Sequence, residues 1–345
     1  MGKKFNYIFI GLSLVLMLVY VFGFTDWTGF SQMVNSIAPL WLIAAVLCMV
    51  GYWLLEAVIL HLFINKLCPG QSLKLSVHVS MIGQFFNCVT PLASGGQPVQ
   101  AYYMVKSGLP VSKSTSALIS KFMIYQCTLI LYSGVLFVLK FGFFKSQVDS
   151  FIYLAIVGFA VNLLVMAFLI CISIFQAPTK KVIHFVLFLG EKIHLVKHRD
   201  VLMSKVDNQV DDYSIAFREN CRDLKNMLLT AGLSAVQLTL YFLVSVCIYL
   251  GFGLPHPQVL SMLAAQSFVL MVSSFVPLPG ASGASEGTFV VFFGIFFTGA
   301  SLGIAMLLWR FVTFYLTLLV GFLFTMRAGV IGKNAPQVEH VDQAE

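Results

Sequence analysis

Long apolar runs separated by short polar stretches recur along the whole chain. A run of about 18 or more apolar residues can cross roughly 30 Å of hydrocarbon as a helix. Such spans are predicted near residues 5–24, 39–65, 113–141, 150–176, 226–252 and 301–326. The pattern predicts an all-α, polytopic membrane protein with about six full spans.

Two further apolar stretches are interrupted by glycine and proline. Residues 73–107 contain TPLASGGQPVQAYYM, and residues 257–298 contain VPLPGASGASEGTFVVFF. Irregular backbone at membrane depth costs several kcal/mol per unpaired group, unless protein or a water-filled cavity surrounds it. We therefore expect two broken helix pairs, either re-entrant or fully crossing, that enclose a central polar cavity.

The two broken stretches share a spacing that indicates an internal repeat. Each break begins with a Pro-Leu pair, and a cation follows at the same distance from a polar residue. The separation of Gln97 from Lys121 along the chain equals that of Glu286 from Arg310. A break, a polar residue and an intramembrane cation at equal spacing favour two related units.

The positive charges predict how these units are oriented. The segment 178–225 is amphipathic and rich in Lys and Arg, which favours the cytoplasmic side. Counting spans from it places both termini in the cytoplasm, with the protein in the cell (inner or plasma) membrane. Repeat one (about 39–141) and repeat two (about 226–326) then face opposite ways, as in inverted-repeat transporters. Residues 1–330 would form one transmembrane domain, followed by a polar tail, 331–345.

The composition excludes an ordinary soluble domain. The chain is 59% hydrophobic and 10% charged, with a mean hydropathy of +0.90, whereas soluble domains carry about 25% charged residues. The net charge of +7 comes from basic residues at segment ends, so nucleic acid is not expected as a partner. Seven scattered cysteines without a CxxC pair indicate neither disulfides nor a metal site.

Four ionisable residues fall within the apolar stretches: Glu56, Lys121, Glu286 and Arg310. Each costs about 2.5–3.5 kcal/mol near the bilayer centre, which favours a functional role. We expect Lys121 and Arg310 to bind a phosphate group, with snorkelling to an interface as the alternative for each. Glu286 would pair with one of these cations, bind a cationic headgroup or titrate. Gln97 would meet the rest of the headgroup, and Glu56 would support a cation.

The breaks also predict backbone donors for an anion. The amino terminus of a half-helix presents free N–H groups and the positive end of the helix dipole. Gly95, Gly96 and Gly283 are expected at these positions. Pro98 suits the first turn of one half-helix, and Ser285 could cap the other.

No sequence motif supports catalysis. GxSxG, HExxH and the P-loop are absent, so no catalytic residue, cofactor or metal is expected. Binding or moving an amphipathic molecule fits the pattern better than an enzyme does. A membrane scaffold that recruits partners through the cytoplasmic segment is a further alternative.

The paired breaks PLASGGQP and PLPGASGASEG, each followed by its cation, resemble the lysylphosphatidylglycerol synthase transmembrane family over about residues 5–330. The resemblance implies a flippase-like domain that moves an anionic or aminoacylated phospholipid between leaflets. Its partners would be membrane lipid and an anionic phospholipid headgroup.

The full-length family adds a soluble domain that transfers lysine from tRNA to phosphatidylglycerol. Here only the short tail GKNAPQVEHVDQAE follows the last span, so unaided catalysis is not expected. The first alternative is a phosphatidylglycerol lysyltransferase, or its membrane part acting with a separate aminoacyltransferase subunit. The second is a flippase for polyprenyl-phosphate carriers.

Overall fold

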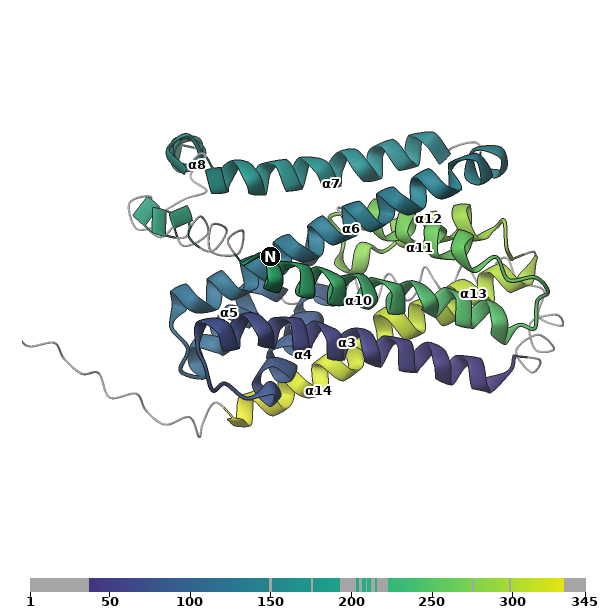
Figure 1. Cartoon of the computed structure of the whole chain (residues 1–345), viewed down its shortest axis with the longest axis horizontal. Helices are drawn as coiled ribbons and strands as arrows, with labels where there is room; N and C mark the ends of the chain where they lie inside the picture. The colour runs from purple at the N-terminus through teal and green to yellow at the C-terminus, as the bar shows by residue number, and fades with distance from the viewer. Residues whose placement is uncertain are drawn as a thin grey trace, which may run out of the picture.

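The protein is a bundle of α-helices (Figure 1). The computed structural model describes residues 37–148, 151–174, 176–192, 203–204, 207–208, 210–211, 215, 223–274, 276–297 and 299–331. The main helices are α3 (Pro39–Leu67), α4 (Leu73–Val89), α5 (Gly96–Lys106), α6 (Val111–Gln147), α7 (Phe151–Ile174), α8 (Gln176–Lys192), α10 (Leu224–Gly251), α11 (Val259–Ser273), α12 (Ala284–Phe293), α13 (Ala300–Arg310) and α14 (Leu316–Ile331). These described residues contain no β-strand, and the predicted all-α polytopic fold is confirmed.

Four helical segments are long and apolar enough to cross a membrane. They are Pro39–Leu67, Val111–Gln147, Leu224–Gly251 and Ser301–Arg327, the last running from α13 into α14. The predicted span at 150–176 corresponds to α7, whose apolar part, Ile152–Phe168, is shorter than these four. The predicted span at 5–24 lies outside the described residues. Within the predicted segment 178–225, the structure describes helix α8 and a few isolated residues.

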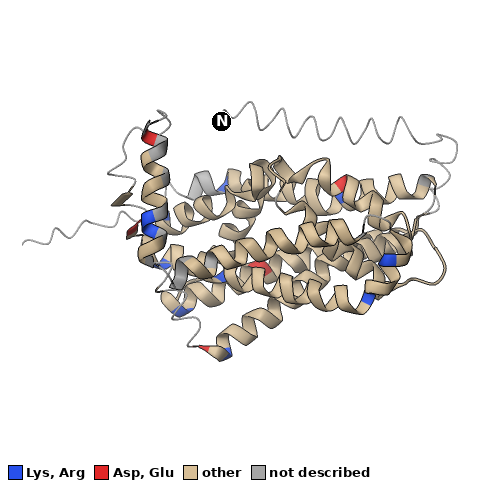
Figure 2. Ribbon diagram, turned by 90° about the horizontal axis from the view of Figure 1, so that it is seen from above, with Lys and Arg blue, Asp and Glu red and all other residues tan. Residues whose placement is uncertain are grey.

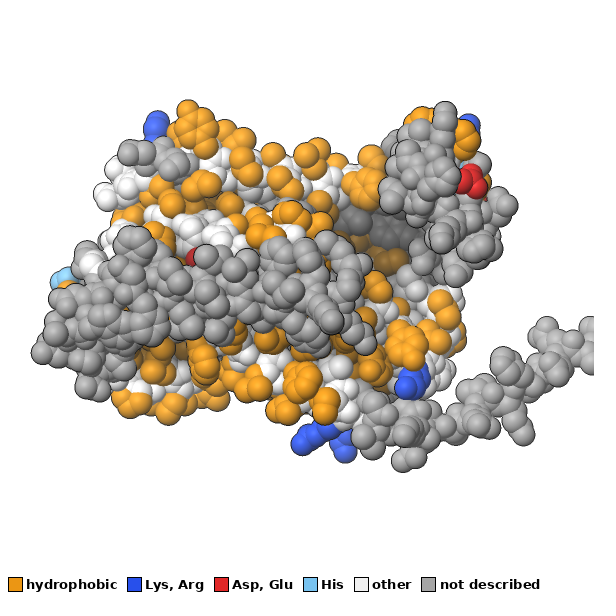
Figure 3. Space-filling model, turned by 180° about the vertical axis from the view of Figure 1, so that it is seen from behind, with side chains coloured by type: hydrophobic (Ala, Val, Ile, Leu, Met, Phe, Trp, Pro, Cys, Tyr) orange, Lys and Arg blue, Asp and Glu red, His pale blue; other side chains and the backbone are white. Residues whose placement is uncertain are grey.

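The outer surface matches an apolar solvent. Large apolar side chains on α6 and α7 are exposed, among them Val138 at 74% and Leu164 at 68%. Figure 2 shows most Lys and Arg residues near the two ends of the bundle, with few charges in its middle. In Figure 3 orange apolar side chains cover much of the described surface, and blue ones lie at its margins. This distribution fits helices that face lipid along their length.

Helices α3 and α10 run antiparallel along each other and are tied at both ends. The Ala38 N–H donates to the Gly251 carbonyl at 2.9 Å at one end, and Lys66 Nζ pairs with Asp223 Oδ2 at 2.7 Å at the other. The Lys66 ammonium and the backbone N–H of Asn226 hold the pKa of the Asp223 carboxyl below its ordinary value. Because α3 precedes the first break and α10 precedes the second, this arrangement supports the predicted opposite orientation of the two units.

The first broken stretch is a helical hairpin. Helix α4 ends at a 3₁₀ turn, Pro91–Ala93, and α5 returns along it. Gln100 Nε2 on α5 donates to the Val79 carbonyl on α4 at 3.3 Å. With 11 residues, α5 is about 16 Å long, too short to cross roughly 30 Å of hydrocarbon.

The second broken stretch repeats this plan. Helix α11 leads to a 3₁₀ turn, Pro279–Ala281, and α12 packs back on α11, with the rings of Phe268 and Phe292 5.4 Å apart. The ten residues of α12 span about 15 Å. Both lengths favour re-entrant hairpins over full crossings. In Figure 1 the α4–α5 hairpin lies toward the left end of the bundle, whereas α12 and α13 lie toward the right.

The two units keep nearly the same register in their helices. Helices α4 and α11 begin at Leu73 and Val259, and helices α6 and α13 begin at Val111 and Ala300. The second pair of helices is offset along the chain by three residues more than the first. This difference is accommodated in the second break, between its Pro-Leu pair and Glu286. The two 3₁₀ turns contact each other in the middle of the bundle, where the candidate site is found.

Candidate functional site

A cavity of about 380 Å³ lies where the two breaks meet. Residues from α3, α4, α5, α6, α10, α11 and α13 line it, together with both 3₁₀ turns. Of the predicted site residues, Glu56, Gln97, Lys121 and Arg310 are in its wall. Glu286 stands directly behind Arg310, and Gly95, Gly96 and Gly283 are not among the lining residues.

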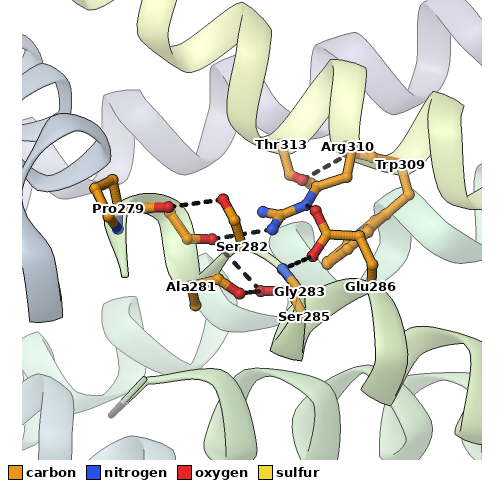
Figure 4. Close-up of polar contacts among 10 residues, drawn as sticks. Pro279, Ala281, Ser282, Gly283, Ser285, Glu286, Trp309, Arg310 and Thr313 are labelled. Carbon is orange, nitrogen blue, oxygen red and sulfur yellow. Dashed lines mark hydrogen bonds and ion pairs between the residues drawn. The ribbon is translucent and has the colours of Figure 1, made fainter. Parts of the chain in front are cut away.

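Arg310 and Glu286 form one buried cluster with the second break (Figure 4). Arg310 Nε donates to Glu286 Oε1 at 2.7 Å, and Nη2 donates to the Gly280 carbonyl at 3.0 Å. Glu286 Oε2 accepts the Gly283 N–H at 2.7 Å. The cation and the acid that the repeat spacing singled out therefore hold each other and the loop between α11 and α12.

The local backbone explains why glycine occupies this loop. Gly280 has φ +61°, and a Cβ there would lie 2.2 Å from the Phe314 ring. Gly283, with φ +85°, caps α12. The predicted capping role of Ser285 is wrong, because its hydroxyl donates to the Ala281 carbonyl at 3.0 Å instead.

Aromatic packing fixes the Arg310 side chain from the other side. Its guanidinium lies 5.5 Å from the Trp309 ring and 5.1 Å from the Phe314 ring. Trp309 itself stacks on Phe289 of α12 at 4.9 Å. Arg310 is only 5% exposed, so it does not snorkel to an interface.

Lys121 finds its carboxylate on a different helix. Its ammonium pairs with Glu56 Oε1 of α3, and Gln237 Nε2 of α10 donates to Glu56 Oε2 at 2.8 Å. Lys121 and Glu56 are each 9% exposed. This cluster joins the helix that precedes the first break to the helix that precedes the second.

The two clusters make the cavity wall electrically balanced. Each buried cation already has one carboxylate partner. An incoming phosphate must therefore share or displace a carboxylate rather than meet a free positive charge. Lys121 and Arg310 each lie ten residues after the start of their helix, or about 15 Å along it, which is close to half of a bilayer's hydrocarbon thickness.

The first hairpin contributes a group of carboxamide side chains that the sequence analysis did not single out, apart from Gln97. The cavity-lining members of this group, which we call the amide wall, are Gln84, Asn87, Gln97 and Gln100. Within each helix the two amides are three residues apart, which places them on one helical face. That i, i+3 spacing inside an apolar stretch was a detectable signal.

Glycines on the first hairpin make room for this wall. A Cβ on Gly96 would lie 2.0 Å from Asn87 Oδ1, and a Cβ on Gly83 would lie 2.2 Å from Gln100 Nε2. A Cβ on Gly95 would lie 2.5 Å from the Thr90 side chain. These contacts make the predicted anion-binding glycines packing positions instead.

Both breaks hold residues in the left-handed region at the cavity. Leu92 and Ala93 in the first 3₁₀ turn have φ +55° and +50°, and Ala281 in the second has φ +51°. All three line the cavity. Strained backbone of this kind costs about 1–3 kcal/mol per residue and gathers at functional sites.

Comparison with known proteins agrees with this architecture. The family described as "Lysylphosphatidylglycerol synthase TM region" matches residues 8–321. A "UPF0104 membrane protein" from Archaeoglobus fulgidus is 22% identical over 326 residues, covering 89% of this chain and 92% of that protein. No solved structure matches. Because the match covers most of the sequence, the chain belongs to the lysylphosphatidylglycerol synthase TM region family.

Proposed function

We propose that this membrane protein holds the headgroup of an anionic or aminoacylated phospholipid between its two breaks and moves that lipid between leaflets. One observation carries the proposal: a polar cavity with two buried cations lies inside an apolar bundle, where two broken hairpins meet. Membership in a family named for lysylphosphatidylglycerol supports a phospholipid as the cargo. The cell membrane, with both termini in the cytoplasm, is the proposed location.

The donors at the cavity suit a phosphate. A guanidinium has five N–H groups, and two of them donate to Glu286 and Gly280. An arriving phosphate can take further donors from Arg310 and from the Lys121 ammonium. Charge-assisted hydrogen bonds of this type are about twice as strong as neutral ones.

The size of the cavity limits what enters it. Its volume of about 380 Å³ falls at the small end of the roughly 300–1,000 Å³ typical of ligand sites. A phospholipid headgroup fits this space, while its acyl chains would remain in the bilayer beside the apolar outer face of the helices. The protein would thus replace hydrocarbon by polar groups only along the path of the headgroup.

The hairpins provide a route from either side of the membrane. They reach the cavity from opposite ends of the bundle in the proposed orientation, and each stops partway. Movement of one hairpin against the rest would expose the cavity to one leaflet at a time, the alternating access seen in inverted-repeat transporters.

Reconstitution into liposomes tests this proposal. Phosphatidylglycerol with a fluorophore on one acyl chain is followed by the loss of fluorescence that a membrane-impermeant quencher causes. We expect wild-type protein to bring inner-leaflet lipid to the outer leaflet, and protein-free liposomes to do so far more slowly.

A pair of variants separates lipid binding from folding. Lys121→Met leaves Glu56 buried without its cation and lowers stability, whereas Lys121→Met with Glu56→Gln removes both charges and is expected to restore stability. If Lys121 binds the headgroup, the stable double variant still loses lipid movement. Wild-type movement in the double variant would remove Lys121 from the path, and no movement by wild-type protein would contradict the proposed function.

A further inference from the structure

The wall of the cavity has different chemistry on its two sides. The first hairpin supplies the four carboxamides of the amide wall. The lining residues of the second hairpin are apolar or small, with hydroxyls at Ser273, Ser274 and Ser285 and no carboxamide among them. A neutral hydrogen-bonding surface therefore faces the second break across the cavity.

Two members of the amide wall have unused hydrogen-bonding capacity. Gln97 and Asn87 are half-buried, and neither side chain makes a hydrogen bond within the described part of the chain. The residue at the position equivalent to Gln97 in the second unit, Glu286, is fully engaged by Arg310 and Gly283. Gln97 stays free because Lys121 pairs with Glu56 instead.

The positions of these amides are set by backbone packing. Asn87 lies against the Cα of Gly96, and Gln100 lies against that of Gly83, so α4 and α5 each fit an amide over a glycine of the other helix. Gln100 is also held by its bond to the Val79 carbonyl. A wall fixed in this way offers its free groups with little further ordering, which favours binding.

The chemistry of a carboxamide points to a particular ligand group. A primary amide both donates and accepts hydrogen bonds, as a hydroxyl does, whereas a phosphate only accepts and an ammonium only donates. The charged groups of the cavity already balance one another. A neutral group with hydroxyls is thus the best match for the amide wall, beside a phosphate held by the cations.

We infer that Gln97 and Asn87 are specificity-determining residues that recognise hydroxyl groups on the lipid headgroup. The cargo is then a phospholipid whose phosphate carries a polyol, either glycerol or a sugar. This inference rests on the proposed function and narrows its substrate.

Three lipids with the same labelled acyl chains test the inference in the liposome assay. Phosphatidylglycerol and phosphatidylglucose carry hydroxyls, whereas phosphatidylpropanol has a similar size to the glycerol lipid and the same charge but no headgroup hydroxyl. Because one net hydrogen bond contributes about a factor of ten or less, we expect wild-type protein to move at least one hydroxyl-bearing lipid about tenfold faster than phosphatidylpropanol. The faster of the two identifies glycerol or sugar as the source of the hydroxyls.

The variants make the outcome specific to the amide wall. Gln97→Leu and Asn87→Leu are each expected to reduce the rate ratio to about two or less. The control is Gln266→Leu on α11, which removes a fully buried carboxamide that also lacks a partner but does not line the cavity; its ratio stays at the wild-type value. The ratio, rather than the absolute rate, is the readout because a general loss of folded protein lowers all rates equally.

The possible failures are distinguishable. Equal movement of all three lipids by wild-type protein, or an unchanged ratio in both Gln97→Leu and Asn87→Leu, overturns the inference and leaves the proposed function intact. Movement of none of the three lipids overturns the proposed function, and the inference with it.

Discussion

The two broken hairpins share a backbone plan but use their polar residues differently. In the second, Glu286 bridges Arg310 and the Gly283 N–H, so the acid and the cation satisfy each other and close the loop. In the first, Gln97 occupies the equivalent position and has no such partner, because Lys121 pairs with Glu56 on α3. Equal spacing along the chain therefore does not produce equal contacts.

This difference assigns separate roles to the two hairpins. The second break is held together by its own ion pair, by backbone hydrogen bonds and by the rings around Arg310. The first break keeps free amides at the cavity. We therefore expect the second hairpin to be sensitive mainly in stability and the first mainly in lipid selectivity.

The largest expected effect comes from breaking the ion pair of the second hairpin. Glu286→Gln leaves the Arg310 cation buried without its carboxylate, which should lower the free energy of unfolding by about 3–5 kcal/mol. Arg310→Met with Glu286→Gln should recover most of the loss. Gln97→Leu, at the equivalent position of the first hairpin, should cost less than about 1 kcal/mol, because it breaks no bond. Denaturant unfolding in detergent measures all three, and equal losses for Glu286→Gln and Gln97→Leu would contradict the comparison.

A smaller effect is expected from adding one methyl group to each hairpin. Gly96→Ala places a Cβ 2.0 Å from Asn87 Oδ1, so overpacking should destabilise the protein by about 1–3 kcal/mol. Gly287→Ala on α12 has open space around its Cβ and should stabilise the helix by about 0.5–1 kcal/mol. Unfolding midpoints of the two variants check this, and a loss at Gly287 as large as that at Gly96 would refute the packing argument.

The smallest effect concerns the strain that both breaks share. Ala93→Gly and Ala281→Gly each relieve a left-handed residue that costs an L-amino acid about 1–2 kcal/mol, partly offset by about 0.5–1 kcal/mol of added chain entropy. Both variants should therefore be stabilised slightly, by about 0.5 kcal/mol.

The matched control for this strain is Ala231→Gly within the regular helix α10, which should lose about 1 kcal/mol. The same unfolding assay compares the three variants. A loss at the breaks equal to that at Ala231 would show that the left-handed residues are not strained.

Much of the fold followed from simple sequence patterns. The apolar runs predicted the helices, and the Pro-Leu and glycine-rich segments predicted both breaks. The spacing of Gln97 to Lys121 and of Glu286 to Arg310 predicted that two cations would lie at matching depths in their units.

The choice of partners could not be predicted in the same way. Lys121 and Glu56 are 65 residues apart, and only the packing of α3 against α6 brings them together. The three extra residues of the second break provide the Gly280 carbonyl and the Gly283 N–H that hold its ion pair. The amide wall depends on how α5 folds back on α4, so only Gln97, beside the break, was identified from the sequence.

The central claim is that a lipid headgroup occupies the cavity between the two breaks. A phosphatidylglycerol with a photoreactive diazirine on its headgroup tests this directly, through irradiation in liposomes and mass spectrometry of the labelled peptides. The account predicts labels in the segments that line the cavity, residues 84–100 and 273–285, and fewer labels when unlabelled phosphatidylglycerol is added in excess. Labels confined to the lipid-facing surface of α7, with none in either break, would contradict it.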